Sequence, residues 1–455
     1  MNVSRFVRGI SAVLVALGLV TGAVSTASAE GFAVSTLSAR GGAFGGGPAS
    51  GMVARADDAS AVAYNPAGLT QVPGTQIMGG LAAVALNLDL ETDNHWCSNS
   101  HQVWPIPHAY VSHQLNDKVW LGLGMFTRWG LGHSYPDGWA SSDFRGSLTG
   151  GSAIKSITML TSTINPTIAY KLNDVWSIAA GVSYTWGYLS LNNQLYGPGV
   201  GDHFGDVRIH SENGHSFGYN LALHAKFNEQ WSAGLTYRSH ERMKFNGKAR
   251  VRGENSMAGI SADMFAAAGG LYNSRGKATI IMPDVITLGV AYKPTERLSF
   301  EADAAYTVWS RWRNLQVNLF DSNPNSVLPS QHPLHSTTQG IHQQKNWRDT
   351  WAFSFSTEYW ALDWLALRAG VLYETSPLNG EAYHDYFIPT NGRLQFATGF
   401  GLKYENWTLD FAYIYMLERE VELSASASHG NADTVNGKFG NGYDHTFALT
   451  LGYKF

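Results

Sequence analysis

A Gly-x-Ser-x-Gly sequence at residues 214–218 is the first candidate for covalent chemistry in the chain. The same pattern forms the sharp turn that exposes the nucleophilic serine of many lipases, which would be Ser216 here. That chemistry requires a helix after the serine, and an acid and a histidine further along the chain. Residues 217–227 instead alternate between apolar and polar side chains, which predicts a strand. The pattern therefore does not favour a hydrolase.

The only cysteine, Cys97, lies between His95 and His101 and raises the question of a metal site. Thiolate and imidazole groups bind zinc, but zinc sites usually have regular, short ligand spacings. These three residues are loosely spaced in a polar stretch, so we expect no metal ion and no cofactor. A single cysteine also excludes an internal disulfide framework. The net charge of −4 gives no sign of the basic surface that nucleic-acid binding requires.

The N-terminus has the organisation of a secretory signal peptide. Arg5 and Arg8 precede an apolar run from Ile10 to Val20, and Ala27-Ser28-Ala29 is a small-residue cleavage site. The apolar run is too short for a membrane-spanning helix, and no later stretch reaches the roughly 18 apolar residues that such a helix needs. We therefore expect residues 1–29 to be removed on export.

The rest of the chain predicts long strands with alternating side chains. In residues 176–188, Trp, Ile, Val and Tyr side chains occupy one face, and Ser, Gly and Thr occupy the other. The predicted strands run to about 11–18 residues, whereas strands of soluble proteins usually have about 5–6. Aromatic residues, 13% of the chain, cluster at the ends of the apolar faces, as in the girdles of membrane barrels. These features favour a transmembrane barrel over a soluble sandwich.

The connections between the strands alternate in length. Long polar segments near 130–155, 190–213, 251–275, 320–347 and 376–392 separate six tight turns. The tight turns are LNDKVW (115–120), KLNDVW (171–176), KFNEQW (226–231), KPTERL (293–298), YWALDW (359–364) and KYENWT (403–408). Short turns at one end and long loops at the other are typical of outer-membrane barrels. Six turns join twelve strands, and residues 75–90 and the C-terminal strand ending at Phe455 bring the total to fourteen. We predict an all-β fold in which residues 74–455 form a 14-stranded antiparallel transmembrane β-barrel.

Residues 30–73 precede the first strand and do not alternate. They contain a glycine-rich run at 41–47 and the uncharged sequence AVAYNPAGL. A fourteen-strand barrel is wide enough to leave a lumen unless something fills it. Glycine and alanine allow close approach to the wall, Pro66 fixes a turn, and Asn65 can bond otherwise unpaired backbone groups. We predict that this segment is an N-terminal hatch inside the lumen, rather than a disordered periplasmic extension.

Several stretches of the chain resemble the FadL family of outer-membrane transporters for long-chain fatty acids and other hydrophobic compounds. Asp57-Asp58-Ala59 and Tyr64-Asn65-Pro66-Ala67-Gly68 are similar to the family's plug signature. The resemblance continues in order through WGLGHSYP (129–136), PDVITLGVAYK (283–293), YTVWSRW (306–312), NWRDTWAFSFSTEY (346–359) and LRAGVLYETSP (367–377). It covers nearly the whole mature chain, so its specificity comes from the order and spacing of the motifs.

The resemblance implies a protein of the Gram-negative outer membrane that carries hydrophobic compounds across the lipopolysaccharide layer. Substrate would be captured at an extracellular groove, enter an internal apolar pocket and leave sideways through the wall at a kink in the third strand. The route is physically reasonable because a fatty acid gains about 0.8 kcal/mol for each buried CH₂ group, and a water-filled channel would forfeit that gain.

The resemblance also suggests which residues carry out these steps. Gly31 and Phe32 match the start of family members, where the first residues contact pocket ligand, although Phe32 could equally pack against the wall. A carboxylate ligand would require a cation. The candidate cations for ligand binding are Arg128, Arg145 and Lys155, with Arg238 and Arg368 as further possibilities. For Arg368 we favour an internal ion-pair network with acidic residues of neighbouring strands.

Two further groups of residues are assigned to the hatch and to the lateral gate. The predicted hatch residues are Asp57, Asp58, Asn65, Pro66 and Ala67. The predicted gate residues are Gly122, Gly124, Gly130 and Gly132, because glycines interrupt strand ladders and permit bulges. Ordinary barrel curvature is the alternative explanation for these glycines. Residues 255–272 are predicted to form an amphipathic helical loop on the extracellular side.

Three other functions stay open from the sequence. Aromatic hydrocarbons such as toluene could follow the same route, because fatty acid and hydrocarbon carriers share the plug and differ in pocket lining. A structural or adhesive barrel would carry no small molecule. An outer-membrane phospholipase is the enzymatic alternative and would depend on Ser216. We favour fatty acid transport by a monomer, because a barrel with its own plug needs no partner chain.

Overall fold

The computed structural model describes residues 33–92, 96–98, 102–144, 151–196, 203–253, 274–320, 340–379, 388, 390–423 and 436–455. Within these ranges no helix is both long and apolar enough to cross a membrane. The predicted signal peptide and the predicted helical loop at 255–272 lie outside the described residues.

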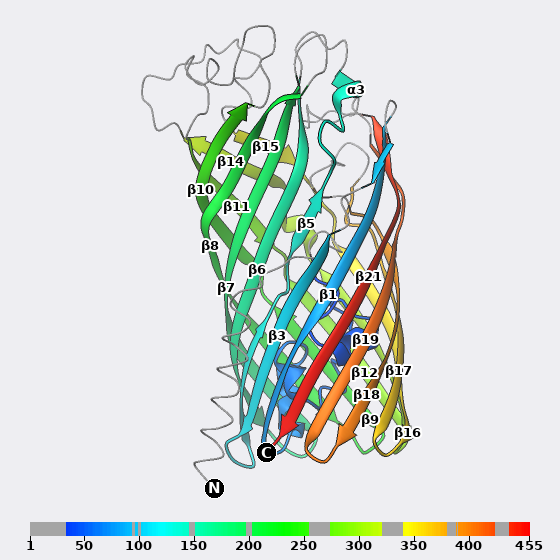
Figure 1. Cartoon of the computed structure of the whole chain (residues 1–455). Helices are drawn as coiled ribbons and strands as arrows, with labels where there is room; N and C mark the ends of the chain where they lie inside the picture. The colour runs from blue at the N-terminus through cyan, green and yellow to red at the C-terminus, as the bar shows by residue number, and fades with distance from the viewer. Residues whose placement is uncertain are drawn as a thin grey trace.

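The described strands form one closed antiparallel barrel (Figure 1). The segments are β1 (Thr75–Thr92), β2 (Trp96–Ser98), β3 (Val103–Gln114), β4 (Val119–Phe126), β5 (Leu131–Ser134), β6 (Gly151–Lys171), β7 (Trp176–Tyr196), β8 (His203–Lys226), β9 (Trp231–Arg238), β10 (Glu241–Gly253), β11 (Ser274–Met282), β12 (Val285–Thr295), β13 (Leu298–Thr307), β14 (Asn314–Phe320), β15 (Gly340–Gln344), β16 (Thr350–Leu362), β17 (Leu365–Glu374), β18 (Arg393–Tyr404), β19 (Trp407–Glu418), β20 (Val421–Leu423) and β21 (Gly437–Lys454). The short helices are α2 (Ala39–Ala43), η1 (Ala59–Val62), η2 (Pro66–Gln71), α3 (Ser141–Phe144) and η3 (Trp309–Arg311).

Fourteen strands cross the barrel wall, because seven of them are each split into two segments. The split strands are β2/β3, β4/β5, β9/β10, β11/β12, β13/β14, β15/β16 and β19/β20, whose halves pair with the same neighbouring strands. The barrel closes because β1 pairs with β3 on one side and with the last strand, β21, on the other. The prediction of a 14-stranded antiparallel barrel is confirmed.

All six predicted tight turns lie at one end of the barrel. Asn173 shows how such a turn forms, because its side-chain oxygen accepts hydrogen bonds from the backbone N–H groups of Val175 and Trp176 at 2.9 and 2.8 Å. The chain also ends here, and the N–H of Phe455 donates to the carbonyl of Thr75 at 2.9 Å. Figure 1 shows the C-terminus beside these turns. Short turns face the periplasm in barrels of this type, so the opposite end is extracellular.

The outer surface is the one a lipid bilayer requires. Along β12, Ile286, Leu288 and Val290 point outward and are exposed, while their neighbours in the strand face the interior and are buried. Aromatic pairs mark the short-turn end of this apolar band, including Trp231 stacked on Tyr292 with ring centroids 4.4 Å apart. The alternation predicted from the sequence thus separates a lipid-facing surface from a lumen.

Residues 33–74, which we call the luminal segment, lie inside the barrel (Figure 1). Almost all of them are buried, and they exchange hydrogen bonds with side chains or carbonyls of β3, β4, β7, β8, β9, β13, β16 and β21. These strands surround the segment from opposite sides of the barrel. Its glycine-rich run allows a tight fold: Gly46 has a φ of +69°, and a side chain there would meet the carbonyl of Ser35 at 2.1 Å.

Candidate functional site

The third strand of the barrel is interrupted between β4 and β5. Four residues, 127–130, separate Phe126 from Leu131, whereas only three separate their partners Thr163 and Met159 on β6. The extra residue takes the chain out of the ladder, as in a β-bulge. Here it turns toward the lumen.

The luminal segment meets this interruption directly. Ala33 forms an isolated antiparallel bridge with Trp129. The N–H of Val34 donates to the carbonyl of Arg128 at 2.9 Å. The start of the luminal segment is therefore bonded to the same residues that leave the wall.

Strand pairing in the wall is incomplete beside the interruption, among the residues that the structure describes. Strand β4 pairs with β3 only from Trp120–Gln114 up to Met125–Ala109, and β5 pairs only with β6 among the described strands. Among the described strands, the upper part of β3, residues 103–108, is bonded to β1 alone. On the side of β5, this stretch of the β3 edge therefore pairs with no strand that the structure describes.

Two prolines occupy this unpaired edge. The N–H of Gln114 donates to Gly74 beside β1, while that of Leu115 donates across the turn to Val119. Because the backbone groups of successive residues in a strand point to alternate sides, the N–H and C=O groups of even-numbered β3 residues face β1 and those of odd-numbered residues face the third strand. Pro105 and Pro107 belong to this set and have no N–H to leave unbonded. Their presence blunts an edge that would otherwise expose free donors.

The four predicted gate glycines lie at two different places. Gly122 and Gly124 lie in the paired part of β4, where a side chain would come within 2.7–2.9 Å of Val62 in the luminal segment. They allow that segment to approach the wall closely. Gly130 lies in the interruption itself and Gly132 follows in β5, so the second pair borders the opening.

A large apolar cluster fills the barrel above the luminal segment. A succession of tryptophans forms its lower part: the ring centroids of Trp129 and Trp309 are 5.8 Å apart, those of Trp309 and Trp347 are 5.0 Å apart, and those of Trp347 and Trp312 are 4.5 Å apart. These rings come from three breaks in the wall, at 127–130, 308–313 and 345–349. Sequence reasoning missed this convergence, although Trp309 and Trp312 lie in a stretch quoted for the family resemblance.

The apolar cluster continues toward the extracellular end. A small void of about 10 Å³ there is enclosed by side chains from several strands and by one loop residue: Leu131, Ile157, Met159, Leu189, Leu191, Ile280, Leu315 and Ile388. No polar side chain lines it. The cluster thus forms a continuous apolar interior from the loop residue Ile388 down to Ala33.

A second cavity, of about 70 Å³, lies where the apolar cluster meets the luminal segment. Ala33, Tyr64 and Trp129 contribute to its wall, together with two cations, Arg128 and Arg238. It lies directly beside the interruption of the third strand.

Both cations of this cavity are fixed in place by contacts with neighbouring residues. The Arg238 guanidinium donates to the carbonyls of Val62 and Ala63 at 2.7 Å each, so it pins the luminal segment. Arg128 lies over the Trp129 ring at 5.1 Å, and its Nη1 is 3.6 Å from a carboxylate oxygen of Glu241. Arg238 also donates to the side-chain oxygen of Asn165 at 3.0 Å and has no ion pair within the described part of the chain. Its positive charge is therefore in excess at this cavity.

The other predicted ligand-binding residues are not brought into this cavity. Gly31, Phe32 and Arg145 lie outside the described residues. Lys155 is near the extracellular end of β6, where it pairs with Asp137, and this hydrogen bond lowers the pKa of the Asp137 carboxyl. Arg368 donates to Glu358 at 2.7 Å and to Asp410 at 2.6 Å, as the ion-pair interpretation expected.

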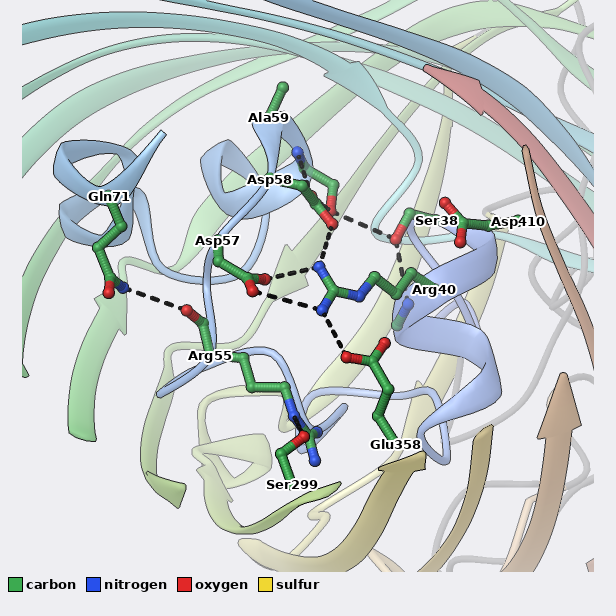
Figure 2. Close-up of polar contacts among 12 residues, drawn as sticks. Ser38, Arg40, Arg55, Asp57, Asp58, Ala59, Gln71, Ser299, Glu358 and Asp410 are labelled. Carbon is green, nitrogen blue, oxygen red and sulfur yellow. Dashed lines mark hydrogen bonds and ion pairs between the residues drawn. The ribbon is translucent and has the colours of Figure 1, made fainter. Parts of the chain in front are cut away.

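Arg40 lies at the centre of the contacts made by two of the predicted hatch residues, Asp57 and Asp58 (Figure 2). Its guanidinium bonds to Asp57 at 2.6 Å, to Asp58 at 3.0 Å and to Glu358 of β16 at 3.2 Å. Burial alone would lower the pKa of Arg40, but the attraction of these carboxylates outweighs it and raises the pKa well above its usual value. A group that stays charged at any physiological pH thus ties the luminal segment to itself and to the wall.

Asn65 fixes the fold of the segment near η2. Its side-chain oxygen accepts from the N–H of Ala67 at 3.1 Å and caps the helix that Pro66 begins. Its amide nitrogen donates to the carbonyls of Val53 and Leu223, at 2.7 and 3.1 Å. One side chain therefore joins two parts of the luminal segment to β8.

A polar cavity of about 640 Å³ lies on the other side of the luminal segment, toward the short turns. Charged side chains line it, among them Arg55, Asp57, Lys226 and Glu358. The luminal segment separates this polar space from the apolar interior above.

Ser216 does not have the surroundings of a catalytic serine, and two of the three candidate metal ligands lie outside the described residues. Ser216 lies within β8, and its hydroxyl donates to the buried Glu241 carboxylate at 2.8 Å. No strand-to-helix turn is present at this serine. Within the described part of the chain, no group of three or more His, Cys, Asp and Glu could hold a metal ion, while His95 and His101 fall outside it.

Comparison with known proteins identifies the family. A model of the family described as outer membrane protein transport protein (OMPP1/FadL/TodX) matches residues 20–455. The chain belongs to this family. It is an outer membrane protein, and its family transports hydrophobic compounds.

Individual relatives in this FadL family are distant but match along most of their length. The chain is 25% identical over 434 residues to a putative outer membrane protein of Neisseria meningitidis serogroup B, with 90% of this chain and 91% of the relative covered. It is 22% identical over 416 residues to the long-chain fatty acid transport protein of Salmonella typhi, with 85% of each covered.

Solved structures of the family share the fold. The FadL homologue of Pseudomonas aeruginosa superposes with a TM-score of 0.76 at 18% identity, covering 93% of this chain and 99% of that chain. The toluene transporter TodX of Pseudomonas putida gives 0.67 at 18% identity, covering 92% and 99%. At such identities the likeness extends to the barrel and not to the choice of substrate.

Proposed function

We propose that this FadL-family protein takes up long-chain fatty acids. The fatty acid enters the apolar interior from the extracellular end, reaches the cavity beside Arg128 and Arg238, and leaves through the wall between β3 and β5. The luminal segment acts as a hatch that closes the direct path to the polar cavity at the periplasmic end.

The excess positive charge at the cavity is the observation that carries this proposal. Arg238 is buried and the Arg128 side chain is 9% exposed, at the end of an apolar interior. Arg128 is paired with Glu241, whereas Arg238 bonds to neutral oxygens and has no ion pair within the described part of the chain. A buried charge is costly unless it is paired. The carboxylate of a fatty acid would supply the missing partner, while its chain would lie along the apolar cluster. A neutral hydrocarbon would leave the excess charge unpaired.

The open edge of β3 supports the lateral exit. It lies next to the cavity, because the residues that leave the third strand, Arg128 and Trp129, also line that cavity. On the periplasmic side the luminal segment is fixed by charged bonds, including Arg40 with Glu358. A fatty acid chain gains about 0.8 kcal/mol for each CH₂ group that is buried away from water. By this route the chain passes from the apolar interior to the membrane without crossing the polar cavity, so it keeps that gain.

Equilibrium binding to the purified, detergent-solubilised protein tests the proposal. Radiolabelled oleate is the ligand, with its uncharged counterpart oleyl alcohol and toluene as competitors. We expect saturable binding of oleate that toluene does not displace. The variant Arg128→Gln should bind oleate about tenfold or more weakly, since a charge-assisted hydrogen bond contributes about 1.5–3 kcal/mol, and should bind the alcohol as before.

Lys155→Gln is the matched control, because Lys155 pairs with Asp137 near the extracellular end and does not line the cavity. It should bind oleate like the unmodified protein. Displacement of oleate by toluene would favour an aromatic hydrocarbon carrier, for which the row of tryptophans offers a suitable lining. Absence of saturable binding of either ligand would point to a structural barrel.

A further inference from the structure

Above the aromatic girdle at the extracellular side of the membrane, strands β8, β10 and β11 carry several basic side chains on their outer surface. Tyr219 on β8 and Tyr237 on β9 belong to that girdle, with ring centroids 5.7 Å apart, and Phe217 is 72% exposed. Strand β10 pairs with β8 on one side and with β11 on the other, and Figure 1 shows these three strands in the upper part of the barrel. Their outward-facing side chains there are polar, whereas inward-facing neighbours such as Met243 and Phe245 are buried.

These outward positions carry a group of cations, which we call the basic face. Its exposed residues are Arg208 on β8, Arg242, Lys244, Lys248 and Arg250 on β10, and Arg275 on β11. Among the described residues of the same three strands, Glu212 is the one exposed carboxylate, and it pairs with Lys248. No ion pair within the described part of the chain joins Arg208, Arg242 or Arg250 to a carboxylate.

The strand register places like charges opposite one another. Arg250 lies opposite Arg208, and Lys248 lies opposite Arg275. Like charges directly opposite on neighbouring strands destabilise a sheet. The arrangement is therefore unfavourable by itself and becomes favourable when an anion lies between the side chains.

Two described lysines elsewhere at the extracellular end are paired with carboxylates. On β21, Lys438 lies 3.2 Å from Glu91 and 3.9 Å from Glu420, so its charge is matched within the protein. Lys155 is likewise paired with Asp137. These two lysines therefore differ from Arg208, Arg242 and Arg250 of the basic face, which have no ion pair in the described part of the chain.

We propose that the basic face binds a phosphorylated glycolipid of the outer leaflet, the lipid part of lipopolysaccharide. The position fits, because Arg242, the first of these cations, follows Tyr237 of the aromatic girdle toward the extracellular end. Headgroup phosphates of the outer leaflet lie just beyond such a girdle. Guanidinium groups bind phosphate oxygens in pairs, and several cations on one flat surface match a headgroup with more than one phosphate. Its acyl chains would lie against Phe217, Tyr219 and Ile281 below. This inference depends on the outer-membrane location and not on the transported substrate.

Titration of the purified full-length protein with defined glycolipids, followed by native mass spectrometry, tests this. The probes are bis-phosphorylated lipid A, the same glycolipid without phosphates, and phosphatidylglycerol. The test variant combines Arg208→Gln, Arg242→Gln, Lys244→Gln and Arg250→Gln. The control variant makes the same charge change at the periplasmic end with Lys118→Gln, Lys293→Gln, Lys403→Gln and Lys454→Gln.

We expect the unmodified protein and the control variant to bind bis-phosphorylated lipid A alike, and the test variant to bind it about tenfold or more weakly. The glycolipid without phosphates should bind all three proteins equally weakly. A heat-dependent shift on electrophoresis confirms that each variant has a folded barrel. Equal loss in test and control variants, or equal binding of phosphatidylglycerol and lipid A by the unmodified protein, would overturn the proposal.

Discussion

The carboxylate of Glu301, on β13, accepts a hydrogen bond of 2.8 Å from the backbone N–H of Val53 in the luminal segment. The same carboxylate accepts from the next two backbone N–H groups, those of Ala54 at 2.7 Å and Arg55 at 3.0 Å. Glu301 is almost fully buried, so water does not compete for these bonds. A single wall residue thus holds three successive peptide groups of the luminal segment.

Glu301→Gln should loosen this attachment without unfolding the barrel. A carboxamide has one accepting oxygen and one donating NH₂ group, so it cannot accept from N–H groups at both of its ends. Leaving a buried N–H without an acceptor costs about 1–3 kcal/mol. We expect hydrogen exchange of residues 51–55 to become about ten- to hundredfold faster, measured by mass spectrometry, while the β13–β16 ladder stays protected.

Glu296→Gln is the control for this prediction, because Glu296 lies in the exposed turn between β12 and β13. Its exchange pattern should match that of the unmodified protein. Unchanged protection of residues 51–55 in the Glu301 variant would mean that other contacts hold the segment.

Gly122→Val should displace the luminal segment from β4. A side chain at Gly122 would lie 2.7 Å from both Leu69 and Val62, closer than packed carbon atoms tolerate. We expect increased exchange in residues 59–72 and a loss of stability of about 1–3 kcal/mol in that region. Gly79→Val is the matched control on β1, where the nearest atom to a new side chain would be 3.9 Å away. Equal behaviour of the two variants would argue against close packing of the segment on β4.

Asn65→Ala combined with Pro66→Ala should lower oleate uptake in cells while leaving the barrel in the membrane. The first change removes bonds to Val53, Leu223 and Ala67, and the second removes the residue that begins η2. Each lost buried hydrogen bond costs about 1 kcal/mol. Uptake is compared at equal amounts of outer-membrane protein. Normal uptake by the double variant would count against a functional role for this motif.

The wall of the barrel could be predicted from the sequence because its signals are local. Alternation over residues 176–188 appears as strand β7, and the turn before it depends on Asn173 bonding two residues of its own turn. Both features need only neighbours in the chain. The assignment of Arg368 to an ion-pair network followed for the same reason, since its inward position is set by the alternation of β17.

The apolar interior could not be predicted in this way. Trp129, Trp309 and Trp347 meet because three strands break at the same depth of the barrel, and strand periodicity carries no information about the relative height of distant strands. One signal was available and unused: Pro105 and Pro107 are two residues apart in a predicted strand. Proline in a strand indicates an edge, which in a closed barrel means an opening.

Deletion of Gly130 tests whether that opening is the exit. With one residue fewer, the third strand would have three residues opposite three of β6, and β4 and β5 could continue as one uninterrupted strand. A continuous strand would follow the wall beside β3 and close the gap. We therefore expect oleate uptake to fall to the level of cells without the protein, at equal amounts of barrel in the outer membrane.

Gly130→Ala keeps the length of the interruption and is the matched control, so its uptake should stay close to normal. Binding of oleate to the purified deletion variant separates a closed exit from a damaged cavity: retained binding with lost uptake is the result expected of a gate. Hydrogen exchange of the third strand over residues 127–131 reports closure, because bonding of its N–H groups to the free carbonyls of Pro105 and Pro107 would slow their exchange. If that protection appears and uptake nevertheless stays normal, substrate leaves by another path.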